Sequence, residues 1–143
     1  TLGNGTTPHS APPTKALIVE SVEDMAAGGD GVCARVVGGD VYCWGSGPVG
    51  DGSDGSEPTA VPTRVMTGAV QLSSKGVITA VDWDGRAWCW GTSYPGQCGG
   101  TSATKLLKPR LVEGLPPVAQ VAAGCRHNCA LTVDGDVYCS GDC

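Results

Sequence analysis

A stretch of seven residues occurs three times in this 143-residue chain, and its recurrence restricts the fold more than any other feature of the sequence. The copies read Gly-Asp-Val-Tyr-Cys-Trp-Gly at 39–45, Gly-Arg-Ala-Trp-Cys-Trp-Gly at 85–91 and Gly-Asp-Val-Tyr-Cys-Ser-Gly at 135–141. Each begins at a glycine and then alternates small or polar residues with large ones, which is typical of a tight turn followed by a β-strand. The chain is therefore interpreted as an array of repeated units.

Two columns of the repeat have the same spacing, which indicates a true period. Intervals of 46 and 50 residues separate the cysteines of the seven-residue stretch, and the residues ten positions before them have the same intervals. The two columns are Cys43, Cys89, Cys139 and Cys33, Thr79, Cys129. We accordingly divide residues 1–143 into a single array of three repeats, with bounds of 1–48, 49–97 and 98–143.

Each repeat contains about four short segments with alternating apolar residues, separated by turns rich in Gly, Pro and Asp. The 23 glycines, 10 prolines and absence of Phe also favour many short elements over long helices. Four short antiparallel strands in units of about 50 residues are typical of propeller blades. We predict an all-β fold of β-propeller-type repeats, with three four-stranded antiparallel blades that each end with the Cys-Trp-Gly strand.

The formal net charge of -5 argues against binding to nucleic acid, which favours a basic protein surface. No apolar run approaches the roughly 20 residues that a membrane-spanning helix needs. The chain begins at Thr1 without a Met or a signal peptide, so we expect a processed form or a fragment whose targeting segment lies elsewhere. The pattern implies no cofactor, and it identifies no small-molecule or carbohydrate ligand.

Eight cysteines are the strongest compositional signal. Zinc sites usually have closely spaced pairs, and only Cys125/Cys129 and Cys139/Cys143, each four residues apart, approach that spacing. The commoner pattern here is a pair ten residues apart on either side of a glycine turn, as in a disulfide-stapled hairpin. Disulfides are therefore favoured over a metal site. They indicate an oxidising compartment, so we expect the protein to be secreted.

Two disulfides are predicted from the ten-residue spacing. We expect Cys33–Cys43 and Cys129–Cys139 each to join neighbouring strands of one blade, because residues ten apart face each other across a glycine turn. In the chain-entropy model each would contribute on the order of 2–3 kcal/mol. Buried free thiols are the alternative.

The other four cysteines have no such assignment. Thr79 stands ten residues before Cys89, so Cys89 lacks the cross-strand partner of the other two copies. We prefer a Cys98–Cys125 pair, which would tie the loop entering the third blade to a turn inside it. That choice leaves Cys89 and Cys143 joined to each other or bonded to another chain, and the other pairings of these four residues stay open.

Further motifs accompany the repeated stretch. They are Leu-Gly-Asn-Gly-Thr-Thr at 2–7, Trp-Gly-Thr-Ser-Tyr-Pro-Gly-Gln at 90–97 and Ala-Ala-Gly-Cys-Arg-His-Asn-Cys-Ala-Leu at 122–131. Together they resemble the regulator-of-chromosome-condensation repeat over essentially the whole chain, and the cysteine content is similar to secreted bacterial members. The resemblance implies a propeller that usually closes with seven blades, so three repeats would not close a ring alone.

Structural roles are assigned to the turn glycines, the tryptophans between blades and a histidine near a turn. These residues are Gly39, Trp44, Gly45, Gly85, Trp90, Gly91, Gly124, His127 and Gly135. A catalytic base is the alternative for His127, but no Ser/His/Asp or Cys/His arrangement accompanies it. Ser140 stands where the repeat would place a third Trp.

Two binding alternatives rest on composition. Trp83 and Trp88 could form an aromatic platform for carbohydrate, although packing is the simpler role for an aromatic residue in such a strand. The acidic run at 51–57 could suggest calcium, but it lacks EF-hand spacing, so we interpret it as a solvated turn.

These observations predict a non-catalytic, secreted repeat protein with a structural or adhesive role through protein–protein contacts. Its expected partners are other copies of itself, which would extend the array head to tail into a ring or a filament. The alternative is a fragment of a longer propeller that acts as an inhibitor or a receptor-like binding module. An extracellular lyase or glycosidase is less favoured, because no carboxylates or histidines cluster in the repeat columns. Nucleotide exchange on a nuclear GTPase does not suit a disulfide-rich chain.

Overall fold

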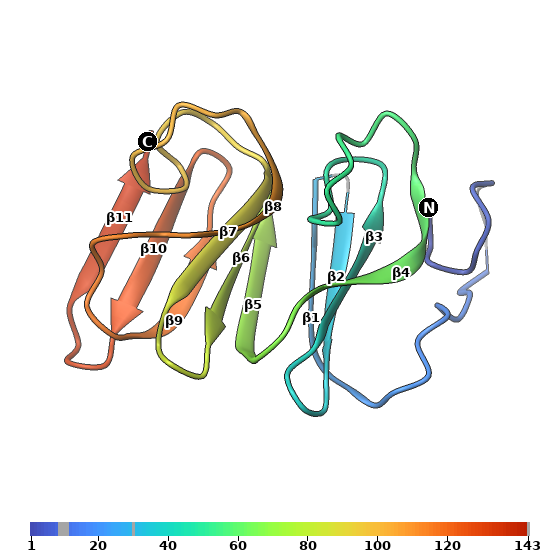
Figure 1. Ribbon diagram of the computed structural model, residues 1–143, viewed down its shortest axis with the longest axis horizontal. Coiled ribbons are helices and arrows are strands. Elements are labelled where there is room, and N and C mark those ends of the chain that lie inside the picture. Colours follow the sequence, from blue (N-terminus) through green and yellow to red (C-terminus); the bar gives the residue numbers. More distant parts are fainter. Residues whose placement is uncertain (9–11, 30, 143) are drawn as a thin grey trace.

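The computed structural model of the protein describes residues 1–8, 12–29 and 31–142. Within these ranges, eleven strands form three antiparallel sheets that stand side by side along the molecule (Figure 1). The described part of the chain contains no helix, and hence none long and apolar enough to cross a bilayer. The predicted all-β fold is confirmed. His9 and Cys143 lie outside the described residues.

Two sheets have four strands and the third has three. The first contains β1 (Val22–Gly28), β2 (Gly31–Val36), β3 (Val41–Gly45) and β4 (Thr59–Met66). The second contains β5 (Ala69–Lys75), β6 (Val77–Asp82), β7 (Ala87–Thr92) and β8 (Lys105–Leu111). The third contains β9 (Val118–Ala123), β10 (His127–Thr132) and β11 (Val137–Gly141). The expected fourth strand is therefore present in the first two blades, whereas the described part of the third blade has three.

The Cys-Trp-Gly stretch forms the third strand of its sheet, so its prediction as the last strand is wrong. β3 pairs with β2 on one side and with β4 on the other, which places Cys43 opposite both Cys33 and Thr63. β4 and β8 contain Pro62 and Pro109, which lack the N–H that a central strand uses and therefore suit a sheet edge. Each four-stranded blade takes this edge strand from the repeat that follows.

Glycine at the start of the repeated stretch is required by the turn. Gly39, Gly85 and Gly135 have φ values of 89°, 74° and 94°, in a region that residues with a Cβ rarely adopt. A backbone hydrogen bond closes each turn, as from the N–H of Val36 to the carbonyl of Asp40 at 2.9 Å. The turn thereby sets the strand register on which the cysteine pairing depends.

The hydrophobic core lies between sheets. A larger cluster joins the first and second sheets and includes Cys33, Val41, Cys43, Leu72, Val77, Ile78, Ala80 and Trp90. A smaller cluster joins the second and third sheets and contains Val81, Ala87, Val118, Val121 and Ala130. All six residues of β6 are buried, because the second sheet has a neighbour on each side. In such an array each unit is stabilised by its neighbours, so the end units keep one uncovered face.

Three disulfides are present in the described part of the chain. Cys33–Cys43 joins β2 to β3 and Cys129–Cys139 joins β10 to β11, each between directly opposed residues whose Cα atoms are 4.1 Å apart. These are the two pairs that the ten-residue spacing predicts.

The predicted Cys98–Cys125 pair is wrong. Cys98 is joined to Cys89, with their Cα atoms 5.7 Å apart, and Cys125 is exposed and free. The same bond rules out the predicted pairing of Cys89 with Cys143. Thr79 lies opposite Cys89 across the strands, so Cys89 has no cysteine as its cross-strand partner. The loop that follows β7 instead brings Cys98 to Cys89.

Candidate interaction surface

Neighbouring sheets are joined by a polar contact that recurs at one position of the repeat. A carboxylate oxygen of Asp24 in the first sheet accepts a hydrogen bond from the backbone N–H of Leu72 in the second (2.9 Å). The side chain of Gln71 makes the same contact with the third sheet: its oxygen accepts from the N–H of Val121 (2.8 Å) and its nitrogen donates to the Val121 carbonyl (3.0 Å). The strand registers place Gln120 at the equivalent position of the third sheet, where it is exposed.

The turn glycines provide a second recurring contact. The carbonyl of Gly39 accepts a hydrogen bond from the N–H of Ala69 in the next sheet (2.9 Å), and the carbonyl of Gly85 accepts one from Val118 (2.8 Å). Gly135 is the equivalent residue of the third sheet. Each sheet therefore holds the next through a turn carbonyl and a polar side chain.

Apolar residues on the first strand of each sheet are buried when another sheet precedes them. Leu72 on β5 and Val121 on β9 are buried in this way. Met25 has the same register position on β1, opposite Ala34, but no sheet of the described residues precedes it and its side chain is 62% exposed.

At the opposite end of the array, the apolar residue that lacks a covering sheet lies on β11. Val41 on β3 and Ala87 on β7 are buried by the sheet that follows. Val137 holds their position on β11 and is 65% exposed. The two end faces therefore carry residues of the kind that the interior of the array buries between sheets.

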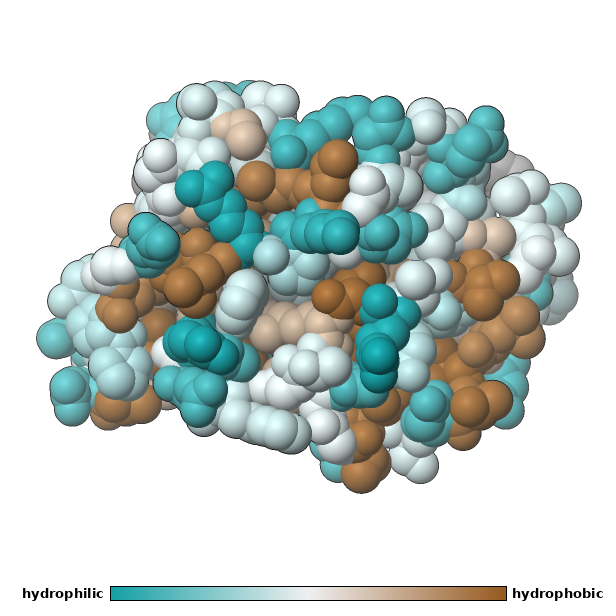
Figure 2. All heavy atoms as spheres, in the orientation of Figure 1, coloured by the Kyte–Doolittle hydropathy of each residue, from teal (hydrophilic) through white to brown (hydrophobic). Residues whose placement is uncertain are grey.

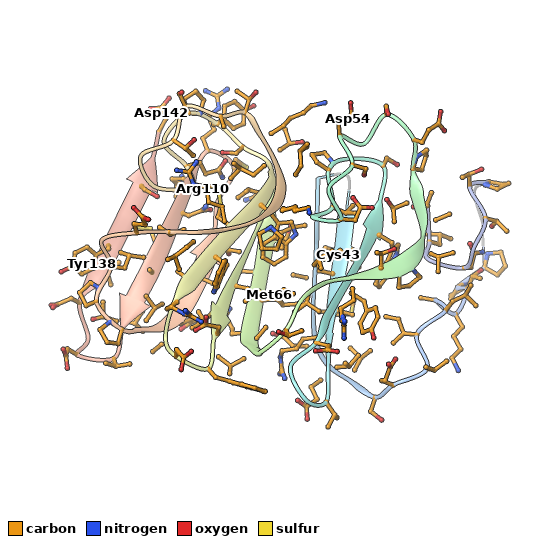
Figure 3. The ribbon with its side chains drawn as sticks, viewed as in Figure 1. Cys43, Asp54, Met66, Arg110, Tyr138 and Asp142 are labelled. Carbon is orange, nitrogen blue, oxygen red and sulfur yellow. A yellow bond between two sulfur atoms is a disulfide. The ribbon has the colours of Figure 1, made fainter. Side chains whose placement is uncertain are left out.

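β11 is also an edge strand. In the described part of the chain it pairs only with β10, whereas β3 and β7 are each covered by a further strand. Figure 3 shows Tyr138 on this outermost strand, at the opposite end of the molecule from the N-terminal segment. At that other end Figure 2 shows hydrophobic residues over the first sheet and the N-terminal segment, where Leu17, Val19 and Val61 are exposed.

A column of polar residues was not predicted from the sequence. Asp24, Gln71 and Gln120 share a register position, one residue before an apolar column. Asp24 and Gln71 each join their sheet to the next, whereas Gln120 is exposed. A comparison of the repeats column by column would have shown that each copy has a polar side chain there. The strand pairing was needed to show that this side chain faces the next sheet.

The tryptophans of the repeated stretch pack against the loops that precede their strands. A Cβ built on Gly3 would lie 2.8 Å from Nε1 of Trp44, and one on Gly50 would lie 2.7 Å from the ring of Trp90. Nε1 of Trp90 also donates to the carbonyl of Val49 (2.9 Å). Trp44 and Trp90 thus fasten loop to strand in the first two repeats.

His127 has a comparable packing role in the third repeat. Its ring covers Gly124, because a Cβ built there would lie 2.5 Å from Nε2 of the histidine. The Gly124 N–H donates to the carbonyl of His127 (2.8 Å). Gly45 ends β3 and Gly91 is the last residue but one of β7; their φ values are 145° and 103°.

The acidic loop at 51–57 is organised by its own hydrogen bonds. Asp51 accepts bonds from the N–H and hydroxyl of Ser53 (2.9 and 2.7 Å) and from the hydroxyl of Thr59 (2.9 Å). Asp54 accepts one from the N–H of Ser56 (2.9 Å). Within the described ranges no group of three or more His, Cys, Asp or Glu residues could hold a metal ion.

Trp83 and Trp88 have different surroundings. Trp83 is 69% exposed and covers the turn at Gly39, where a Cβ would lie 3.0 Å from its ring. Nε1 of Trp88 donates to Asp82 (2.8 Å), and the Arg86 guanidinium lies 5.7 Å from the centroid of the Trp88 ring. Trp88 therefore belongs to a polar cluster with an acid and a cation.

Asp82 is the centre of that cluster. One carboxylate oxygen accepts from the backbone N–H groups of Asp84 and Arg86 (both 2.9 Å), and the other accepts from Nε of Arg86 and Nε1 of Trp88 (both 2.8 Å). Burial acts to raise the pKa of Asp82, but the hydrogen bonds from Arg86 and Trp88 lower it by more, so the pKa lies below its ordinary value of 3.8. The charged carboxylate is thus the form that the fold stabilises.

We expect Asp82→Asn to reduce the acid sensitivity of the fold. Because the pKa of Asp82 is lower in the folded state, its stabilising contribution is fully present above the unfolded pKa and is lost as the pH falls through the folded pKa. Denaturation curves from pH 7 to 2 should therefore show a shallower loss of stability below about pH 4 in the variant. The matched control is Asp84→Asn, whose side chain is largely exposed; an equal change in both slopes would contradict the assignment.

Comparison with known proteins identifies similar repeats. The family model described as the regulator of chromosome condensation (RCC1) repeat matches residues 84–131. The ultraviolet-B receptor UVR8 of Arabidopsis thaliana is 33% identical over 147 residues, which cover 96% of this chain and 33% of the receptor. The chain thus spans about a third of the length of that relative.

Two solved structures are similar in fold. The crystal structure of human WBSCR16 superposes with a TM-score of 0.81 at 22% identity, covering 98% of this chain and 40% of that one. Yeast RCC1 (Prp20), solved bound to Kap60, has a TM-score of 0.71 at 30% identity and covers 84% of this chain and 29% of that one. The sheet arrangement of this chain is therefore the propeller arrangement of such repeats.

Proposed function

Because the chain belongs to the regulator of chromosome condensation repeat family, we propose that it is a secreted propeller-type interaction module with a structural or adhesive role. Its partner in this proposal is a further copy of the same chain, bound head to tail. The yeast relative solved with Kap60 is a precedent for a protein partner.

The complementarity of the two end faces carries the proposal. Inside the molecule, the side chain of Gln71 contacts the backbone of Val121, which has the position of Met25. In a head-to-tail pair, Gln120 of one copy would make this contact with Met25 of the next. The exposed side chains of Met25 and Val137 would then be buried as their equivalents are within the array.

A second contact between the two copies would reproduce the hydrogen bond that a turn glycine makes between sheets. Gly39 and Gly85 use their carbonyls to accept a hydrogen bond from the first strand of the next sheet. The Gly135 carbonyl would accept in the same way from Val22 of the next copy, which stands at the position of Ala69 and Val118. Each contact copies a geometry that the molecule already uses between its own sheets.

The open edge of β11 favours the same direction of assembly. The strands that cover β3 and β7 contain the segments Pro-Thr-Arg-Val at 62–65 and Pro-Arg-Leu at 109–111. Residues 13–17, Pro-Thr-Lys-Ala-Leu, are the related segment of the first repeat and belong to no strand. This segment of a second copy would supply the strand that β11 lacks, because an unpaired strand edge readily accepts another strand.

The disulfides support the secreted part of the proposal. Three are present among the described residues, two of them between directly opposed strand residues. Disulfides persist in oxidising compartments and are rare where thiols are kept reduced. In a longer chain of the same family, further blades would cover the two faces instead, and the module would act as an inhibitor or a receptor-like domain.

Light scattering after size-exclusion chromatography tests the association. We expect the chain to form particles heavier than its 14.4 kDa, and Met25→Glu or Val137→Glu to give monomers, because each places a charge in the contact. The control Leu107→Glu changes a partly exposed residue of β8, away from both end faces, and should leave the mass unchanged.

Mixing the two variants tests the direction. Met25→Glu leaves the face of β11 intact and Val137→Glu leaves the face of β1 intact, so a mixture should form heterodimers that stop at two chains. A face-to-face dimer through β1 would instead survive Val137→Glu. A monomeric wild-type chain at roughly 100 µM, well above a micromolar Kd, would overturn the association.

A further inference from the structure

The third repeat lacks the indole ring that fills the gap between the first and second sheets. There, the fully buried Trp90 of the second sheet packs on Gly50 and donates to the carbonyl of Val49. Ser140 has the equivalent position on β11, opposite Asn128, as Trp90 is opposite Ile78.

A cavity of about 140 Å³ lies between the second and third sheets at this point. Ser140 and Gly99 line it at the positions that correspond to Trp90 and Gly50, and Tyr138 and Trp88 add aromatic surface. Five aliphatic residues line it as well, Ala87, Val112, Leu115, Val121 and Ala130, and the other lining residues include the polar side chains of Thr79, Gln97 and Asn128. The missing ring has therefore left a partly enclosed apolar space.

One wall of the cavity contains a polar group without a partner. Asn128 is only 9% exposed, and its nitrogen donates to the carbonyl of Gln97 (3.0 Å), which also accepts a bond from the hydroxyl of Ser140 (2.9 Å). Because the nitrogen is placed by that bond, the other amide atom is the oxygen. This oxygen is buried and has no hydrogen-bond donor among the described residues. An unpaired buried acceptor is costly, and a bound donor would relieve it.

We propose that this cavity binds a small, neutral, planar aromatic molecule with one N–H or O–H donor, such as indole or phenol. The ring would take the place that Trp90 occupies between the first two sheets, and its donor would bond the amide oxygen of Asn128. The size is suitable, since an engineered apolar cavity of about 150 Å³ binds benzene. Glu113 also lines the cavity, so an anionic aromatic molecule is disfavoured.

Titration calorimetry and ¹H–¹⁵N NMR with three probes test this site. Indole should bind saturably and shift the amide signals of Asn128 and Tyr138. Indene, which has the same shape but no N–H, should bind about tenfold more weakly. A tenfold difference in affinity corresponds to roughly 1.4 kcal/mol, which is the contribution expected from one hydrogen bond. Indole-3-acetate should bind more weakly than indole because of Glu113. Equal affinity for indole and indene would overturn the role of Asn128.

Two variants complete the test. Ser140→Trp restores the residue of the other repeats and should abolish indole binding, whereas the control Ser102→Trp, in an exposed loop, should not. Asn128→Leu keeps the shape of the side chain and should bring the indole and indene affinities together. Absence of saturable indole binding to the wild-type chain would overturn the site, as would unchanged binding to Ser140→Trp of native secondary structure. If Ser140→Trp does not fold, the affinities measured with Asn128→Leu decide.

Discussion

Trp90→Ala is expected to destabilise the protein by about 3–5 kcal/mol, the range found for removal of a large buried aromatic residue. The Trp90 side chain is fully buried between the first and second sheets, in the larger hydrophobic cluster. Its replacement would leave a cavity and would also leave the Val49 carbonyl without its donor. Since small domains have only about 5–15 kcal/mol of net stability, a change of this size would bring the fold close to unfolding.

The measurement is urea denaturation followed by far-ultraviolet circular dichroism, with the free energy of unfolding extrapolated to water. Trp83→Ala is the matched control, because the same side chain there is largely exposed and rests on a turn. Its effect should stay below about 1 kcal/mol, as for most surface positions. Similar losses in the two variants would contradict the assignment of Trp90 to the centre of the core.

Replacing both Cys33 and Cys43 by serine is expected to lower the free energy of unfolding by about 2–5 kcal/mol. The disulfide joins directly opposed residues of β2 and β3 and constrains the unfolded chain over a ten-residue separation. Both sulfurs are also fully buried, so two hydroxyl groups would replace apolar surface.

Cys125→Ser is the control for this experiment, because Cys125 is exposed and has no disulfide partner. Its free energy of unfolding should equal that of the wild-type chain within about 0.5 kcal/mol. Addition of a reductant should lower the stability of the wild-type chain toward that of the double variant. A double variant as stable as the wild-type chain would show that the disulfide is dispensable for the fold.

Much of the fold was predictable because the same pattern of turn and strand residues occurs in each of the three repeats. The turn at Gly39 recurs at Gly85 and Gly135, and a requirement for positive φ leaves a glycine in each copy. The same turn places residues ten apart opposite each other, so two disulfides could be assigned from spacing alone. Local geometry of this kind depends on residues that are close in the chain, so it can be predicted from the sequence pattern.

The strand that completes each blade and the partner of Cys89 in the third disulfide were not predictable in the same way. β4 pairs with β3 only after a loop of more than ten residues, so nothing near Trp44 shows that a fourth strand follows. Cys98 reaches Cys89 through the path of such a loop. Loop paths depend on what the loop packs against, and sequence spacing does not contain that information.

For the proposed interaction surface, the sequence likewise indicated the types of residue but not which sheet they face. The alternation within β1 marks Met25 as apolar and Asp24 as polar, but it does not show which sheet they face. Only the packing of three sheets shows that Gln71 contacts the next sheet while Gln120 has none to contact. The unpaired oxygen of Asn128 likewise depends on how the loop at Gln97 is folded over Ser140.

The sequence by itself determined the repeat, the all-β fold and the cysteine pairs that lie across a turn, because each depends on interactions between residues close in the chain. The tertiary structure decided which strand completes each blade, which cysteine Cys89 bonds, and which faces and cavity remain unfilled. The strand pairing, the open faces and the cavity depend on contacts between residues far apart in sequence, since burial and hydrogen-bond pairing are properties of the packed sheets. The Cys89–Cys98 bond joins residues only nine apart, but it depends on the path of the loop between them, which is set by what that loop packs against.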